Sequence, residues 1–195
     1  MAKQFEKLSA EHKDFIQRQH IFFTASATSD SRVNISPREI GALRIIDDNT
    51  VVYLDRTGSG NETAAHMLAD GRMTIMFCAV NGPPLIMRLY GKGTSLGWDT
   101  PAFSKLMSEH FDGDAPLGTR QFMMLNIDLV QTSCGYGVPL FDYQGERAAI
   151  ENWHDNKGPE GIRAYWQVEN QTSMDGLPTG LKLSLIHISE PTRPY

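Results

Sequence analysis

Residues 21–37 read IFFTASATSDSRVNISP, and this stretch decides the kind of fold to expect. Its side chains alternate between two faces, with Phe22 on one face and Phe23 on the other. The polar turn Ser29–Ser31 interrupts the alternation, which then resumes up to Ser36. Period-two alternation on both sides of a polar turn predicts a β-hairpin.

The segments around the hairpin switch between helical and extended patterns. Apolar residues at helical spacing predict helices, and runs that are apolar on one or both faces predict strands. Gly91 and Gly93, inside one such run, predict a bulge or a tight bend. Many strands with short helices, and no regular βαβ alternation, predict a mainly β fold with α (α+β), a small barrel with helices packed outside. Helices are expected at 9–18, 61–69, 100–111 and 146–168, and further strands at 43–46, 51–54, 73–80, 85–95 and 122–132.

The composition excludes several classes of protein. Among 195 residues, 23 Asp and Glu exceed 18 Lys and Arg by five, which argues against a basic nucleic-acid-binding surface. The longest mostly apolar run, Met73–Val80, is too short to span a membrane, and no signal-peptide core follows Met1–Lys7. Cys78 and Cys134 allow at most one disulfide and match no zinc spacing. We therefore expect a cytoplasmic protein that binds neither nucleic acid nor membrane.

The last residues differ in character from the rest of the chain. Leu183–Arg193, LSLIHISEPTR, resembles the translation of a sequencing adapter, although its alternation would also suit a C-terminal strand. We expect the native sequence to end at or just after Lys182, with 183–195 as a non-native tail.

The segment Tyr53–His66, YLDRTGSGNETAAH, is the strongest candidate for a binding site. Its glycines remove side chains from a turn between a strand and a helix. One interpretation is a capping box, in which Ser59 and Glu62 satisfy each other's backbone amides. The other is an anion site, because free amides and the positive end of a helix attract phosphate. The two interpretations compete, since Glu62 places a negative charge where phosphate would lie.

Other chemistry-bearing residues give weaker patterns. Arg38 and Arg44 follow the hairpin, and an arginine at a strand end can offer two donors to a phosphate. The histidines have no metal-binding spacing, so no metal site is expected, and His66 fits a packed, hydrogen-bonded role as well as a ligand contact. Cys134 has no identifiable charge partner that would activate it. No catalytic residue is identified by pattern.

Taken together, several segments resemble one known family. They are the hairpin quoted above, then VVYLD, ETAAHMLADGRMTIMFCAV and LIMRLYGKG, within Phe15–Gln131. Asp70-Gly71-Arg72-Met73 is similar to the family's usual entry into a barrel strand, with Gly71 in place of proline. The chain resembles the FMN-binding split-barrel proteins related to pyridoxamine 5′-phosphate oxidase. The stretches QTSCGYGVPLFDYQGER and NQTSMDGLPTG resemble one uncharacterised branch of that family.

This resemblance implies a six-stranded, Greek-key-like split β-barrel, with short peripheral helices and a C-terminal helical segment. Residues 1–145 would form the flavin-binding domain with its N-terminal helix, and 146–182 a helical extension of the same domain. It also implies a homodimer with FMN at the interface. Carried onto matching positions, the implied cofactor-binding residues are Ser36, Pro37 and Arg38 near the phosphate or ribityl chain, Tyr53, Leu54 and Asp55 beside the ring, and Ser59, Gly60, Asn61, Glu62 and Thr63 around the phosphate.

The sequence departs from that family at the helix start. Pyridoxamine phosphate oxidases proper carry a Ser-Arg-Lys cluster where this chain has Asn61, Glu62 and Thr63, and Arg38, Arg44 or Arg56 would have to compensate. The implied function is an FMN-dependent oxidoreductase that transfers hydride to or from an unidentified small molecule. The alternative, which Glu62 favours, is a non-catalytic or differently loaded split barrel that binds deazaflavin F420 or haem.

Overall fold

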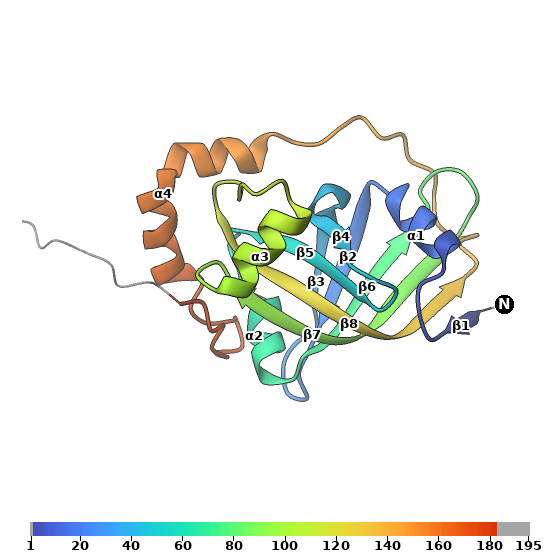
Figure 1. The fold of residues 1–195 in the computed structure, drawn as a ribbon, viewed down its shortest axis with the longest axis horizontal. Helices are drawn as coiled ribbons and strands as arrows, with labels where there is room; N and C mark the ends of the chain where they lie inside the picture. Colours follow the sequence, from blue (N-terminus) through green and yellow to red (C-terminus); the bar gives the residue numbers. More distant parts are fainter. Residues whose placement is uncertain (1, 183–195) are drawn as a thin grey trace, which may run out of the picture.

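The computed structural model describes residues 2–182 and shows an antiparallel sheet curled into a half-barrel, with helices around it (Figure 1). The described chain contains eight strands, four α-helices and one 3-10 helix. The strands are β1 Lys3–Phe5, β2 Ile21–Ser26, β3 Asn34–Glu39, β4 Leu43–Ile45, β5 Thr50–Arg56, β6 Arg72–Cys78, β7 Ile86–Gly97 and β8 Thr119–Ser133. The helices are α1 Ala10–Gln17, η1 Ile40–Ala42, α2 Glu62–Ala69, α3 Pro101–His110 and α4 Ala149–Glu169.

The strand order is β3-β2-β6-β7-β8-β5-β4, and β1 pairs with β8 beyond the end of β5. The expected α+β barrel is therefore present, but the expectation of six strands is wrong. Two three-residue strands, β1 and β4, extend the sheet. Strand β1 has no pattern from which it could be predicted, because all three of its residues are exposed and show no alternation.

Strand periodicity places the core inside the curled sheet. In β2, Phe22, Thr24 and Ser26 are buried, and the intervening residues are partly exposed. The register of β7 on β8 shifts between Tyr90 and Gly91, which confirms the expected irregularity there. A Cβ atom at Gly91 would lie 1.9 Å from the carbonyl oxygen of Asn126, so only glycine fits that close approach.

Strand β5 is buried on both faces because it separates two apolar clusters. Val51 and Tyr53 belong to the main cluster inside the sheet, and Val52 and Leu54 belong to a second cluster beneath α3. The predicted helices are all present with shifted ends, and Ser9 caps α1 as expected. Helix α4 contains a kink, with non-helical backbone at Gly158 (φ 63°).

The two ends of the strand order, β3 and β4, are the edges at which the barrel is split. Across the split, a side-chain ion pair joins β3 to β5: Arg38 Nη2 lies 3.0 Å from Asp55 Oδ1. Helix α2, which follows β5, contacts β2, β6 and β7. The split is therefore bordered by charged side chains. None of the helices formed by residues 2–182 has both the length and the apolarity to cross a lipid bilayer.

Candidate functional site

A cavity of about 400 Å³ lies at the split, between β3, the end of β5 and the loop that leads into α2. We call it the cleft, and the loop Thr57–Asn61 the glycine loop. The structure brings nine of the eleven expected cofactor-binding residues to the lining of the cleft: Ser36, Pro37, Arg38, Asp55, Ser59, Gly60, Asn61, Glu62 and Thr63. Residues that are far apart in the sequence thus meet at one polar surface.

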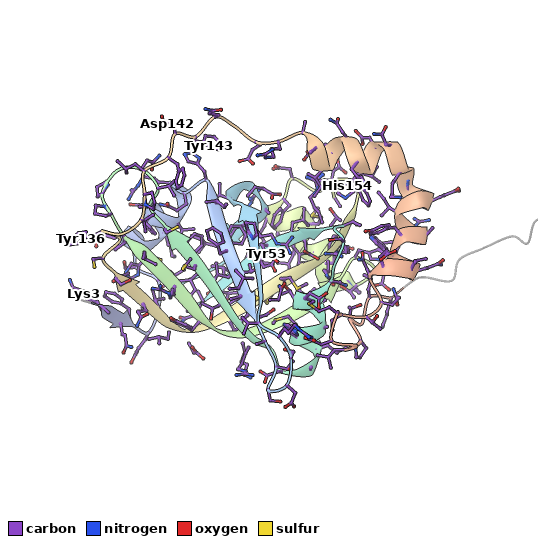
Figure 2. The ribbon with its side chains drawn as sticks, turned by 180° about the vertical axis from the view of Figure 1, so that it is seen from behind. Lys3, Tyr53, Tyr136, Asp142, Tyr143 and His154 are labelled. Atoms are coloured by element: carbon purple, nitrogen blue, oxygen red, sulfur yellow. The ribbon has the colours of Figure 1, made fainter. Side chains whose placement is uncertain are left out.

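The remaining two expected residues, Tyr53 and Leu54, do not line the cleft. Tyr53 is fully buried inside the sheet, where its ring packs edge-on against Phe22 at 5.6 Å and lies 5.5 Å from the Arg38 guanidinium (Figure 2). Leu54 points to the opposite face of β5, into the cluster beneath α3. In this arrangement the buried Tyr53 ring packs against the Arg38 guanidinium.

Asp55 is the centre of the polar network in the cleft, and only 1% of it is exposed. Its carboxylate accepts hydrogen bonds from Arg120 Nε at 2.9 Å and Gln121 Nε2 at 2.8 Å, in addition to its pairing with Arg38. Burial by itself raises the pKa of Asp55, but the charges of Arg120 and Arg38 and these hydrogen bonds hold that pKa below its ordinary value. Asp55 is therefore ionised and holds two arginines at the cleft.

Two arginine donors at the cleft lack acceptors. Among the described residues, Arg38 Nε and Arg56 Nε are buried nitrogens without a hydrogen-bond partner. The other nitrogens of Arg56 contact Glu151 Oε1 at 2.6 Å and His154 Nδ1 at 3.2 Å. Buried donors are normally satisfied, so these unpaired guanidinium nitrogens mark positions where an acceptor is missing. An anionic ligand would supply one.

The capping-box interpretation of Ser59 and Glu62 is wrong. Helix α2 begins at Glu62, and its N-cap is Asn61, whose side chain makes no capping hydrogen bond. The Glu62 carboxylate instead accepts from the backbone N–H of Met174, with N–O distances of 3.0 and 3.2 Å. Asn61 accepts from Gln121 Nε2 at 2.7 Å. The first turn of α2 is thus left without a side-chain cap beside the cleft.

Arg120 and Gln121 are the polar residues that sequence reasoning missed. Arg120 is only 2% exposed, and its Nη1 donates to the carbonyl oxygen of Gly60 at 2.9 Å. Both residues directly precede the apolar run that begins at Phe122, where the sequence predicts the strand to start. The pattern that could have indicated them is a polar pair directly before a buried apolar run, which marks the polar end of a strand.

Two other candidates are placed away from the cleft. Arg44 does not compensate for Glu62, because its Nε donates to the carbonyl oxygen of His110 at 2.9 Å and its guanidinium lies 4.4 Å from the Phe111 ring centre. His66 is buried with its Nδ1 2.9 Å from Ser26 Oγ, in keeping with a packed, hydrogen-bonded role. Of the three arginines expected to compensate for Glu62, Arg38 and Arg56 line the cleft and Arg44 does not.

A second, larger cavity of about 840 Å³ adjoins the cleft, and we call it the groove. Its floor includes Ile21 and Phe23, on the outer face of β2. Its cover is the strap, residues 134–148, which runs from the end of β8 to α4 (Figures 1 and 2). Within the strap, Tyr143 stacks on His20 with ring centres 3.8 Å apart. Three residues line both cavities: Pro37 and Arg38 of β3 and Ile150 of α4.

The chain has clear relatives among known proteins. Residues 8–134 match the family model described as pyridoxamine 5′-phosphate oxidase. A protein of Aspergillus flavus, "Pyridoxamine 5′-phosphate oxidase family protein ustO", is 37% identical over 192 residues, covering 89% of this chain and 76% of its own length.

Two solved structures share the fold. A HupZ variant from Group A Streptococcus is 19% identical with a TM-score of 0.50, over 64% of this chain and 98% of that one. A putative pyridoxamine 5′-phosphate oxidase from Lactobacillus delbrueckii is 16% identical with a TM-score of 0.50, over 65% and 94%. At these identities the likeness is one of fold.

Proposed function

Because the chain belongs to the pyridoxamine 5′-phosphate oxidase family, we propose that its cleft holds the phosphate of FMN and its groove the flavin ring. The observation that carries this proposal is the junction of the two cavities at Arg38, where a buried guanidinium N–H without an acceptor lies at the polar end of an apolar groove. An amphiphilic ligand with an anionic end matches that division.

The arginines at the cleft offer donors to an anion. Three arginines line it, Arg38, Arg56 and Arg120, with the two carboxylates Asp55 and Glu62. Glu151 pairs with Arg56 from outside the lining, so these charges sum to zero, and the unpaired nitrogens of Arg38 and Arg56 are what favour an anion. Arginine also offers phosphate two parallel donors. Glu62 opposes the anion, but its carboxylate accepts from the Met174 amide. The residues of the cleft therefore fit a phosphate.

The chain's own residues would bind and orient the ligand. Arg38 would donate to the phosphate from the floor of the cleft, while Asp55 holds that arginine in place. Phe23 and the strap would exclude water from the apolar part. Bound FMN supplies the hydride chemistry, so no protein side chain needs to be the redox group. The proposed function is hydride transfer to or from a small molecule.

We also infer that the protein acts as a homodimer. Val33 and Ile35, at the β3 edge beside the cleft, are 66% and 65% exposed, which is unusual for neighbouring large apolar side chains. A second copy would cover them. Analytical ultracentrifugation of the purified protein tests this inference, and a monomer at micromolar concentration would contradict it.

The visible spectrum of the purified protein tests the cofactor proposal. Two flavin bands, with FMN identified after heat release, are the expected result. If the protein is purified colourless, added FMN should bind with a measurable dissociation constant. A Soret band would identify the bound group as haem. Release of F420 would show that a deazaflavin occupies the site in place of FMN. A colourless protein that binds no added FMN would contradict the proposal.

A further inference from the structure

Helix α4 and its C-terminal end hold the glycine loop through three side chains, His154, Trp166 and Asn170, which we call the clamp. Trp166 Nε1 donates to Thr57 Oγ1 at 2.7 Å, and His154 Nε2 lies 3.2 Å from the Thr57 carbonyl oxygen. Figure 2 shows His154 on α4, on the side of the helix that faces the sheet. The clamp lies outside residues 8–134, the part that matches the family model.

Asn170 has the densest contacts of the clamp and is fully buried. Its Nδ2 donates to the carbonyl oxygen of Gly58 at 3.2 Å, and its Oδ1 accepts from Arg120 Nη1 at 2.9 Å. Its backbone carbonyl accepts from Asn61 Nδ2 at 3.3 Å. One residue therefore contacts both ends of the Gly58–Asn61 segment and the arginine that pairs with Asp55.

These contacts matter because glycine has little conformational preference of its own. In Gly58-Ser59-Gly60 the carbonyl oxygens of both glycines are occupied, one by Asn170 and the other by Arg120. An anion site needs carbonyl oxygens directed elsewhere, since their partial negative charge repels the ligand. The Asn170 amide supplies both the donor for Gly58 and the acceptor for Arg120.

We propose that Asn170 is a positioning residue of the cleft, which fixes the glycine loop and Arg120 in the arrangement that accepts a phosphate. Asn170 does not line the cleft, so it acts through Gly58 and Arg120. The identity of the anion rests on the proposed function, whereas the hold on the loop rests on the contacts themselves.

The test compares Asn170→Ala with Gln171→Ala, the neighbouring amide, whose side chain donates to the Trp166 carbonyl oxygen and to no residue of the glycine loop. Each full-length variant is titrated with FMN and with riboflavin, which lacks the phosphate. We expect Asn170→Ala to weaken FMN binding about tenfold or more and to leave riboflavin affinity within about twofold of wild type. Gln171→Ala should match wild type for both ligands.

Hydrogen exchange of the ligand-free protein is measured on the same variants. Faster exchange of the amides of residues 57–61 is expected in Asn170→Ala and not in Gln171→Ala. Should Asn170→Ala fail to fold, Asn170→Ser, which keeps a small polar side chain and loses the Nδ2 donor to Gly58, takes its place with the same expected pattern.

The outcomes separate this proposal from the proposed function. If the wild-type protein binds neither FMN nor riboflavin, the cofactor assignment is refuted. Hydrogen exchange of residues 57–61 then tests the hold of Asn170 on the glycine loop by itself. Equal losses for FMN and riboflavin would overturn the positioning role, because they would indicate general loss of structure. The positioning role would also be overturned if Asn170→Ala changed neither the hydrogen exchange of residues 57–61 nor the ratio of the affinities for FMN and riboflavin.

Discussion

The cleft and the groove meet at Arg38 but are built in opposite ways. The cleft residues Asp55, Arg120 and Asn61 are 1%, 2% and 3% exposed and are joined by hydrogen bonds between β5, β8 and the glycine loop. The groove is covered by the strap, a segment without regular secondary structure, in which Tyr143 and Phe141 are 47% and 62% exposed. One region is fixed by buried polar contacts, and the other is held by a few surface contacts.

This difference suggests a division of roles. Buried polar networks specify one geometry, because each partner left unsatisfied is costly. A loosely held cover can accommodate different shapes at little cost. We therefore expect the cleft to define the anionic group that is bound and the groove to tolerate variation in the rest of the ligand.

The largest effect is expected from Asp55→Ala. The change leaves Arg38 and Arg120 without their buried partner, so the free energy of unfolding should fall by about 3–5 kcal/mol. Asp70→Ala is the matched control: its partners Arg72 and Lys92 are largely exposed, and it should cost under about 1 kcal/mol. Urea unfolding measures both, and similar losses would show that the cleft is no more rigidly built than the surface.

Arg38→Ala should act mainly on binding. Loss of a charge-assisted hydrogen bond worth about 1.5–3 kcal/mol should raise the dissociation constant for FMN roughly ten- to hundredfold. Arg72→Ala removes a surface arginine outside the cleft and should leave the constant unchanged. Isothermal titration calorimetry compares the two, and an affinity unaffected by Arg38→Ala removes this residue from the site.

The stability of the protein should also depend on pH through His154, which contacts Thr57 of the glycine loop. Burial lowers the pKa of His154, so the folded state resists a proton that the unfolded chain takes up near pH 6.5. Stability should be fully present above that pH and decline as the pH falls from about 6.5 through the lower folded-state pKa. His154→Gln should show a shallower decline in chemical denaturation between pH 8 and pH 5. An identical slope would mean that His154 does not contribute.

The smallest effects are expected in the strap. Tyr143→Ala removes a half-exposed ring that stacks on His20, and should change the free energy of unfolding by less than about 1 kcal/mol. Riboflavin affinity should fall only a few-fold, because the ring lines one side of the groove. Tyr136, in the same strap but 84% exposed and outside the groove, is the control and should have no effect. A large loss of stability in Tyr143→Ala would contradict the contrast between the two regions.

Local patterns in the sequence were sufficient for most elements and insufficient for the contacts that complete the cleft. Alternation in β2 and helical spacing in α2 depend on neighbours in the chain, so both could be predicted. Arg120 contacts Asp55 across 65 residues of sequence, and no local pattern contains that pairing. The capping box failed for the same reason, because the partner of Glu62 is Met174, 112 residues away.

The candidate cofactor residues were predicted from a family resemblance rather than from periodicity. That resemblance located the cleft, but it could not show that Tyr53 and Leu54 lie behind its lining. The proposed non-native tail, 183–195, lies outside the described residues.

The order in which the clamp and the glycine loop occur along the chain has a consequence for biosynthesis. Chains are synthesised from the N-terminus, and the glycine loop leaves the ribosome more than a hundred residues before Asn170, which is 112 residues beyond Gly58. Strands β2 to β8 precede α4, so the sheet can pair while the nascent chain still lacks the clamp. The cleft is therefore completed last, and a chain truncated before α4 would form a sheet whose glycine loop keeps its contacts with Arg120 and Gln121 but lacks those with the clamp.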